Sequence, residues 1–203
     1  MVLQDYIEQA YEIYITEIIP LHGSQIVGTQ MLIRQLDKGG RSLLTDGKEN
    51  KFWHIIGFDE NNDYIMCHST PGLRDECKEN CISRNTSQRL TKNMSSAAYE
   101  MKYSCAFRSQ KIGYIPFIIE LSNENKAQVF YWKRDRRSKE HGLETKHYFR
   151  FKDREIDYVI IFKQINFASG DIRLLLITAF PITQIKTIME FKSDYNRAKG
   201  HLI

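Results

Sequence analysis

The stretch DYVIIFKQINFASGDIRLLLITAF, residues 157–180, decides the fold of this chain. It holds two strand-like apolar runs, 157–163 and 173–180, which are separated by a polar turn. Two further runs of the same kind, 128–134 and 146–152, precede it. The spacing of the four runs permits pairing in sequence order, which predicts an antiparallel β-meander.

Helical patterns flank these strands. Residues 3–19 carry apolar side chains at three- and four-residue steps, and Pro20 ends the pattern. Residues 183–199 have a similar spacing with Lys and Arg toward the end, which predicts a C-terminal helix. Another helix is expected to begin near Arg108 and to be interrupted at Pro116. The predicted fold class is α+β: N-terminal helices, a four- to five-stranded antiparallel sheet and a C-terminal helix.

The region between the first helix and the sheet is less regular. Residues 26–33 predict a strand or a second helix, and residues 37–50, which include three glycines, predict a loop. The run KFWHIIGF, 51–58, is apolar and aromatic and predicts a strand. The polar composition of residues 59–100 predicts an insertion within a single domain that spans residues 1–203.

Length and composition exclude several classes of protein. The 203 residues, of which 42% are hydrophobic, suit one compact domain with a sizeable core. No apolar run approaches the roughly 20 residues of a membrane helix, and the N-terminus lacks the pattern of a secretory signal. We therefore expect a cytoplasmic protein with no membrane partner. The net charge of +4 is too small to indicate a polyanionic partner by itself.

The chain has four cysteines: Cys67, Cys77, Cys81 and Cys105. The first three lie near His68, a composition that can hold zinc, but they lack the paired Cys-x2-Cys spacing of structural zinc sites. In a cytosolic chain, reduced thiols are the expected state. A zinc site in the insertion stays open as an alternative.

Positive charge is concentrated between residues 131 and 154, where nine Lys or Arg occur with four Asp or Glu. Aromatic residues are interleaved with these cations. Phosphates attract cations and unstacked bases pack on flat side chains, so this composition is typical of single-stranded nucleic-acid binding. The alternative is a solvated hairpin tip whose aromatic side chains face the core. The predicted RNA-binding residues are Trp132, Lys133, Arg134, Arg136 and Arg137.

Common catalytic motifs are missing from the sequence. It has no Walker loop, dinucleotide-type glycine pattern, nucleophile elbow or His-Glu-x-x-His helix. The carboxylates form scattered doublets rather than the converging set that a metal-dependent nuclease needs. Cleavage of RNA without a metal or another cofactor needs the 2′-hydroxyl as nucleophile, a general base, a general acid and cations on the phosphorane.

Four residues are candidates for this chemistry. His54 can transfer a proton, although in a strand it would share a face with core residues and act as a core histidine. Arg108 and Lys111 lie three residues apart, so a helix would place both on one face, to clamp a phosphate or to face solvent. Thr178 follows the last apolar run, where its hydroxyl can bond a phosphate oxygen or merely lie in the sheet.

Several stretches also carry a resemblance to a known family. They are DYIEQAYEIYITEII (5–19), KFWHIIG (51–57), FRSQKIGYIPFIIE (107–120), DYVIIF (157–162) and RLLLITAFPI (173–182). In that order they resemble an N-terminal helix, a Phe-Trp-His-Ile strand, an Arg-Cys-Glu-Arg-Ile-Arg-Trp-Ile segment, and a closing strand pair with a Leu-Thr-Ala-Tyr-Pro motif. These are features of the phage-associated branch of the Barnase–EndoU–Colicin–RelE (BECR) ribonuclease fold, a set of small, usually metal-independent RNases and toxins.

The resemblance implies a metal-independent RNA endonuclease of toxin or phage-associated type, with RNA as its substrate and a cognate antitoxin protein as a candidate partner. Attack by the 2′-hydroxyl would leave a 2′,3′-cyclic phosphate. The site residues that it implies are His54, Arg108, Lys111 and Thr178. The chain departs from the pattern at Gln110 and Gly113, where the family has Glu and Arg. A catalytically weak or inactive module on the same scaffold, which binds RNA or a protein, is therefore the alternative.

Overall fold

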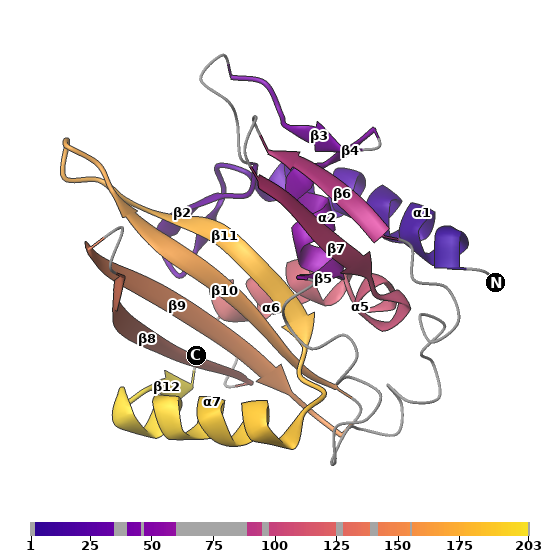
Figure 1. The fold of residues 1–203 in the computed structure, drawn as a ribbon. Coiled ribbons are helices and arrows are strands. Elements are labelled where there is room, and N and C mark those ends of the chain that lie inside the picture. The colour runs from indigo at the N-terminus through magenta and orange to yellow at the C-terminus, as the bar shows by residue number, and fades with distance from the viewer. Residues whose placement is uncertain are drawn as a thin grey trace.

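The computed structural model describes residues 3–34, 40–45, 47–59, 89–94, 98–124, 128–138, 142–154 and 156–202. Figure 1 shows three layers, with a central sheet between helices on both of its faces. The helix α7 (Ile185–Arg197) covers one face. On the other face lie α1 (Leu3–Ile13), α2 (Asn50–Ile56) and α6 (Tyr114–Asn123). The predicted α+β class, with helices at both ends of the chain, is confirmed.

The central sheet has seven strands in the order β1-β2-β11-β10-β9-β8-β12. Its middle is the predicted antiparallel meander, formed by β8 (Val129–Ser138), β9 (Gly142–Lys152), β10 (Asp157–Asn166) and β11 (Ile172–Pro181). The short strands β1 (Gln25–Ile26) and β2 (Thr29–Leu32) extend it beyond β11, and β12 (His201–Leu202) extends it beyond β8. Because β2 runs parallel to β11, the sheet is mixed, and the prediction of a purely antiparallel sheet of four to five strands was wrong.

The N-terminal helix was predicted from its apolar periodicity, and the structure confirms it. After α1 the chain continues helically as a π-helix, Tyr14–Ile18, and a short 3-10 turn, Ile19–Leu21. Of the residues that set the periodicity, Ile7, Ala10, Tyr14 and Ile18 are buried and Tyr6 is half-buried, while nothing is described of the Leu3 side chain. This segment therefore packs one continuous stripe into the hydrophobic core that it shares with Phe149 and Phe162 of the sheet.

The strand predicted over residues 51–58 is wrong for most of its length. Asn50–Ile56 form α2, and only the end of the run enters a strand, β5 (Gly57–Asp59). Phe52, Trp53, Ile55 and Ile56 are all buried, so nearly the whole circumference of the helix is enclosed. A short apolar run that is buried on every side has no period that distinguishes a helix from a strand.

The predicted insertion contains regular structure in the residues that are described. β6 (Arg89–Met94) and β7 (Ala98–Ser104) form a small antiparallel sheet with β5, in the order β5-β7-β6. The predicted loop over 37–50 holds a short hairpin of β3 (Leu44–Thr45) and β4 (Lys48–Glu49). Cys67, His68, Cys77 and Cys81, which carried the zinc alternative, lie outside the described residues. Cys105 is a buried thiol.

The interrupted helix is present, but its interruption precedes Pro116. α5 (Ala106–Gln110) ends before Lys111, and α6 begins at Tyr114. Pro116 therefore lies in the first turn of α6, where a missing backbone N–H costs nothing because that turn has no intrahelical acceptor. This break determines where Arg108 and Lys111 point.

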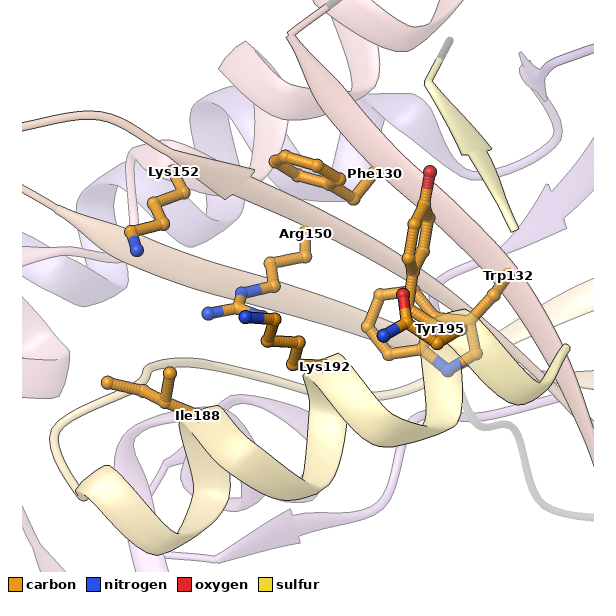
Figure 2. Close-up of a pocket in the computed structure, with 8 residues that line it drawn as sticks. Phe130, Trp132, Arg150, Lys152, Ile188, Lys192 and Tyr195 are labelled. Carbon is orange, nitrogen blue, oxygen red and sulfur yellow. The ribbon is translucent and has the colours of Figure 1, made fainter. Parts of the chain in front are cut away.

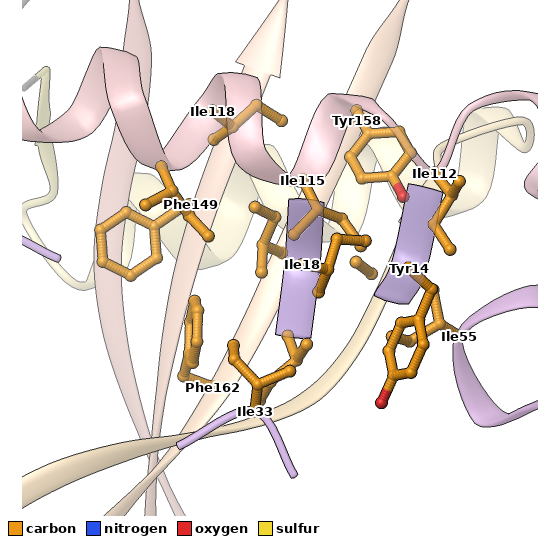
Figure 3. Close-up of a cluster of buried hydrophobic side chains, with 14 of the residues drawn as sticks. Tyr14, Ile18, Ile33, Ile55, Ile112, Ile115, Ile118, Phe149, Tyr158 and Phe162 are labelled. Carbon is orange, nitrogen blue, oxygen red and sulfur yellow. The ribbon is translucent and has the colours of Figure 1, made fainter. Parts of the chain in front are cut away.

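The larger hydrophobic cluster fills the space between the sheet and the helices α1, α2 and α6 (Figure 3). Its fully enclosed members include Phe149, Tyr158 and Phe162 from the sheet and Ile115 from α6. A smaller cluster under α7 is built around Trp132. In the part of the chain that the model describes, no helix is both long enough and apolar enough to cross a membrane.

Candidate functional site

The candidate site lies where α2 packs against the outer edge of β11 and α5 packs against α2. β2 pairs only with residues 173–175, so the second half of β11 has helices rather than a strand beside it. A bulge there separates Leu176, which pairs with Phe162, from Thr178, which pairs with Ile161. The carbonyl oxygen of Leu176 accepts a hydrogen bond of 2.7 Å from Lys51 Nζ.

Lys51 is a residue of this site that the sequence interpretation missed. It is only 8% exposed, although lysine is rarely buried without a partner. It lies in the KFWHIIG run one helical turn before His54, so a helical interpretation would have placed both on one face of α2. The strand interpretation hid this relation.

Arg108 links the three elements of the site. Its Nη1 donates a hydrogen bond of 2.7 Å to the carbonyl oxygen of Gly57, the residue that ends α2. Its guanidinium carbon lies 5.0 Å from the centre of the Phe180 ring, near the end of β11. Such a cation over an aromatic face is an attractive contact that also fixes the plane of the guanidinium.

Lys111 points elsewhere than Arg108, so the prediction that both share one helix face was wrong. α5 ends at Gln110, and Lys111 has left the helical conformation. Its Nζ lies 5.9 Å from the ring centres of both Phe107 and Tyr114. The two cations therefore contact different aromatic groups, and an i, i+3 spacing places side chains together only while a helix continues.

The Tyr158 hydroxyl is the second group that the sequence did not single out. Its ring stacks on Tyr114 at 5.8 Å, and its oxygen is buried with no hydrogen-bond partner among the described residues. Burial raises the pKa of this phenol, and the nearby positive charge of Arg108 acts in the opposite direction. In Figure 3 the hydroxyl points into the interior beside Ile112. In the sequence, Tyr158 is only one more member of an apolar run.

Thr178 and His54 approach the site from two directions. Phe180 packs with the cluster under α7, and strand alternation puts Thr178, two residues earlier in the same register, on that same face. His54 is half-buried on α2, three residues before Gly57. The fold thus brings Thr178 and Arg108 to one end of β11 and places the helix of His54 at its edge.

A single buried carboxylate, Glu49, holds the start of α2. Glu49, immediately before the helix, is buried and accepts hydrogen bonds from Tyr14 Oη at 3.1 Å and from Arg34 Nη2 at 2.7 Å. Burial raises the pKa of the Tyr14 hydroxyl, and the Glu49 charge adds to the effect. These bonds connect α2 to the N-terminal helix, so they position His54 without reaching it.

The basic run of the β8–β9 hairpin does not form one surface. Trp132 lies under α7, so alternation along β8 puts Arg134 and Arg136 on the α7 face and Lys133 and Arg137 on the opposite face. Arg134 forms an ion pair with the buried Asp194 of α7. The expected single RNA-binding patch is therefore divided between the two faces.

Trp132 is not available as a platform for bases. It is 1% exposed, and its ring stacks on Tyr148 at 4.9 Å. The interpretation that the aromatics of this hairpin face the core holds for both residues. Sequence alone could not decide whether these aromatic side chains stack on bases or pack in the core. A strand with helices on both of its faces buries aromatic side chains, so their presence in the run fits either role.

No family model matches the chain, and neither a curated protein nor a solved structure is significantly similar to it. Within the described ranges, no three His, Cys, Asp or Glu side chains converge as a metal site. The cations at the end of β11 and the half-buried imidazole of α2 are the groups from which a function can be argued.

Proposed function

We propose that the chain is an RNA endonuclease that needs no metal, with its site at the junction of α2, α5 and the end of β11. The observation that carries this proposal is the fixed position of Arg108 between the Gly57 carbonyl and the Phe180 ring. A guanidinium that is held in place can bind a phosphate at two oxygens without losing further side-chain freedom. A ribonuclease of the BECR type is the reading that the motifs around His54 and Thr178 favour.

In this mechanism His54 accepts the proton of the RNA 2′-hydroxyl, and the 2′-oxygen forms a bond to phosphorus. The P–O5′ bond breaks, and the 5′-oxygen leaves as a hydroxyl with a proton from solvent. Arg108 stabilises the negative charge of the phosphorane, and Thr178 donates a hydrogen bond to a phosphate oxygen. The products are a 2′,3′-cyclic phosphate and a 5′-hydroxyl end.

Lys111 and the exposed cations of the β8–β9 hairpin contribute to RNA binding rather than to cleavage in this proposal. Lys111 adds positive charge beside Tyr114, and the exposed Lys133 and Arg137 attract the RNA backbone from one face of the sheet. Such contacts raise affinity for any strand without selecting a sequence. A cellular toxin of this kind would act on RNA in the cytoplasm and be restrained by an antitoxin protein.

A second candidate is a module that binds RNA or a protein partner without cutting. The exposed Gln110 supports it, because a neutral amide stands where the resembled family has a carboxylate. Salt-sensitive RNA binding without cleavage at high protein concentration would favour this candidate over the enzyme.

The test is incubation of the purified protein with total RNA in EDTA, followed by analysis of the 3′ ends. We expect cleavage that leaves cyclic phosphate ends, and a loss of roughly 100-fold or more in rate for His54→Ala. Arg108→Ala should lose a similar factor. Arg173→Ala is its matched control. Arg173 lies in the first half of β11, away from the site, and its guanidinium also packs on a phenylalanine ring, 4.6 Å from the centre of Phe167.

Three results would contradict the proposal. Cleavage that EDTA abolishes would require a metal, and cleavage that survives His54→Ala would remove its base. Equal loss of rate in Arg108→Ala and Arg173→Ala would mean that stability, rather than phosphate binding, explains both effects.

A further inference from the structure

A pocket of about 280 Å³ lies between α7 and the β8–β9 part of the sheet (Figure 2). Its size is near the lower end of ligand pockets, which begin at roughly 300 Å³. Its lining combines aromatic rings with three cations. Its lining includes Phe130, Arg150, Lys152, Lys192 and Tyr195.

The positive charge of the pocket is only partly compensated. Arg150 is 8% exposed and binds the buried Asp157 with two nitrogens, Nε at 2.7 Å and Nη2 at 2.6 Å. Its third nitrogen, Nη1, is thereby left for a ligand. Lys152 and Lys192 form no ion pair with any residue of the described ranges, and Figure 2 shows Arg150 and Lys192 pointing toward one another from β9 and α7. Converging cations repel unless an anion lies between them.

The other walls of the pocket are flat and apolar. The rings of Phe130 and Tyr195 are 5.5 Å apart and nearly perpendicular, so each presents a different surface to the pocket. The ring centres of Tyr195 and Trp132 are 6.0 Å apart with perpendicular planes, a contact that fixes the orientation of the tyrosine ring. Aromatic walls favour a planar group, because bases stack on aromatic side chains in single-stranded nucleic-acid sites.

The pocket is in register with the candidate site. Phe130 pairs with Arg150, Arg150 with Val159, and Val159 with Phe180, so these four residues form one row across the α7 face. Adjacent strands are about 4.8 Å apart, which places Arg150 about 10 Å from Phe180 along the row. Phe180 is the ring on which Arg108 rests. The pocket and the ring that contacts Arg108 therefore lie on one face of the sheet at backbone positions about two strand widths apart, a span that a single strand of RNA can bridge.

We propose that this pocket binds a nucleoside monophosphate unit, with its base against Phe130 and Tyr195 and its phosphate between Arg150, Lys152 and Lys192. The unit is either a free mononucleotide or one nucleotide of an RNA strand. Its role as a subsite for RNA rests on the proposed ribonuclease function, whereas binding of the mononucleotide does not.

The test is calorimetric titration of the full chain with the four common ribonucleoside monophosphates, with a nucleoside and inorganic phosphate as separate probes. We expect saturable binding of at least one monophosphate, at least tenfold tighter than either fragment. Lys192→Ala should weaken it about tenfold, which is the loss of one charge-assisted hydrogen bond. Lys186→Ala, an exposed lysine of α7 outside the pocket, is the matched control and should change nothing.

A second variant separates the two halves of the ligand. Phe130→Leu should weaken the monophosphate about fivefold or more and leave inorganic phosphate binding as it is. A short RNA with 2′-O-methyl groups cannot be cleaved by 2′-hydroxyl attack. If it binds more than tenfold tighter than the monophosphate, the ligand is an RNA strand; if not, the ligand is a free nucleotide.

Absence of monophosphate binding at millimolar concentration would overturn the proposal, as would equal weakening by Lys192→Ala and Lys186→Ala. Phosphate that binds as tightly as the monophosphate would exclude the base. The outcome is independent of cleavage, because His54→Ala should bind the monophosphate like the wild type. If the protein binds the monophosphate but does not cleave RNA, the proposed ribonuclease function is refuted and the proposed binding pocket is supported.

Discussion

The two faces of the central sheet differ in chemistry. The face under α1, α2 and α6 is packed almost entirely with apolar side chains, and Phe162 in its middle is fully buried. The face under α7 has a smaller apolar cluster that is mixed with the ion pairs Arg150–Asp157 and Arg134–Asp194. The first face supplies most of the apolar core, whereas the second holds charged groups in fixed ion pairs.

The two faces differ because the helices that cover them differ in total width. A single helix with its side chains is about 10 Å wide, while the four meander strands together span roughly 15–19 Å. α7 therefore shields only part of its face and leaves the pocket beside Arg150 open. On the other face, several helices enclose the side chains around Phe162, while Lys133 and Arg137 near the hairpin tip remain exposed (Figure 1). A face with an incomplete cover has to be partly polar, because apolar residues there would stay in water.

The largest expected effect comes from truncating one phenylalanine on each face. Phe162→Ala should reduce the free energy of unfolding by about 3–5 kcal/mol, because the enclosed site cannot collapse around the cavity. Phe191→Ala, at 9% exposure under α7, should cost about 1–3 kcal/mol, since a single helix can settle onto the sheet. Denaturant unfolding measures both. Equal costs would mean that α7 packs as rigidly as the other layer.

A smaller effect is expected at Gly200, which passes close to the pocket wall. A Cβ atom there would lie 2.5 Å from the Tyr195 ring and 2.7 Å from the backbone oxygen of Tyr131. Gly200→Ala should therefore cost about 1–3 kcal/mol, as overpacked sites do. Gly113→Ala is the matched control, since nothing lies within 4 Å of its added Cβ and its φ of −62° suits alanine. A loss of stability in the control and none at Gly200 would contradict the packing described here.

The meander and both terminal helices could be predicted from local patterns, because alternation and the 3.6-residue period act within one element. The parallel pairing of β2 with β11 could not, since it joins segments about 140 positions apart. The same limit explains α2. Phe52, Trp53, Ile55 and Ile56 of this run are buried, and their tertiary contacts rather than the period of the run select the helix.

The candidate site was predictable only in part. His54, Arg108 and Thr178 come from the motifs, and their elements pack together in the fold. Lys51 and Tyr158 were missed, because a buried lysine and a phenol with no hydrogen-bond partner in the described ranges are defined by neighbours that the sequence does not reveal. The basic hairpin is a second example of this limit. The sequence shows how many cations the run contains, but strand alternation places them on two opposite faces of the sheet.

The smallest expected effect concerns a row of hydrogen-bonded polar side chains on the otherwise apolar face, where His147 is 4% exposed. Its Nδ1 accepts the hydroxyl of Tyr131 and its Nε2 donates to Gln164 Oε1, each at 3.0 Å, in the tautomer that keeps both bonds. Burial raises the pKa of Tyr131 to about 12, so the phenol remains a donor throughout the neutral range. Burial also lowers the pKa of His147 from its usual 6.5, and the nearby Lys133 acts in the same direction.

A histidine whose pKa is lowered by folding binds protons more readily in the unfolded chain. Its contribution to stability is therefore complete above pH 6.5 and is lost as the pH falls from 6.5 toward the lowered value. His147→Asn keeps an acceptor for Tyr131 and removes the titration, so its unfolding free energy should fall less steeply between pH 7.5 and 5 than that of the wild type. Parallel curves would show that the imidazole is already exposed to protons in the folded state, and that this face is less completely covered than its packing implies.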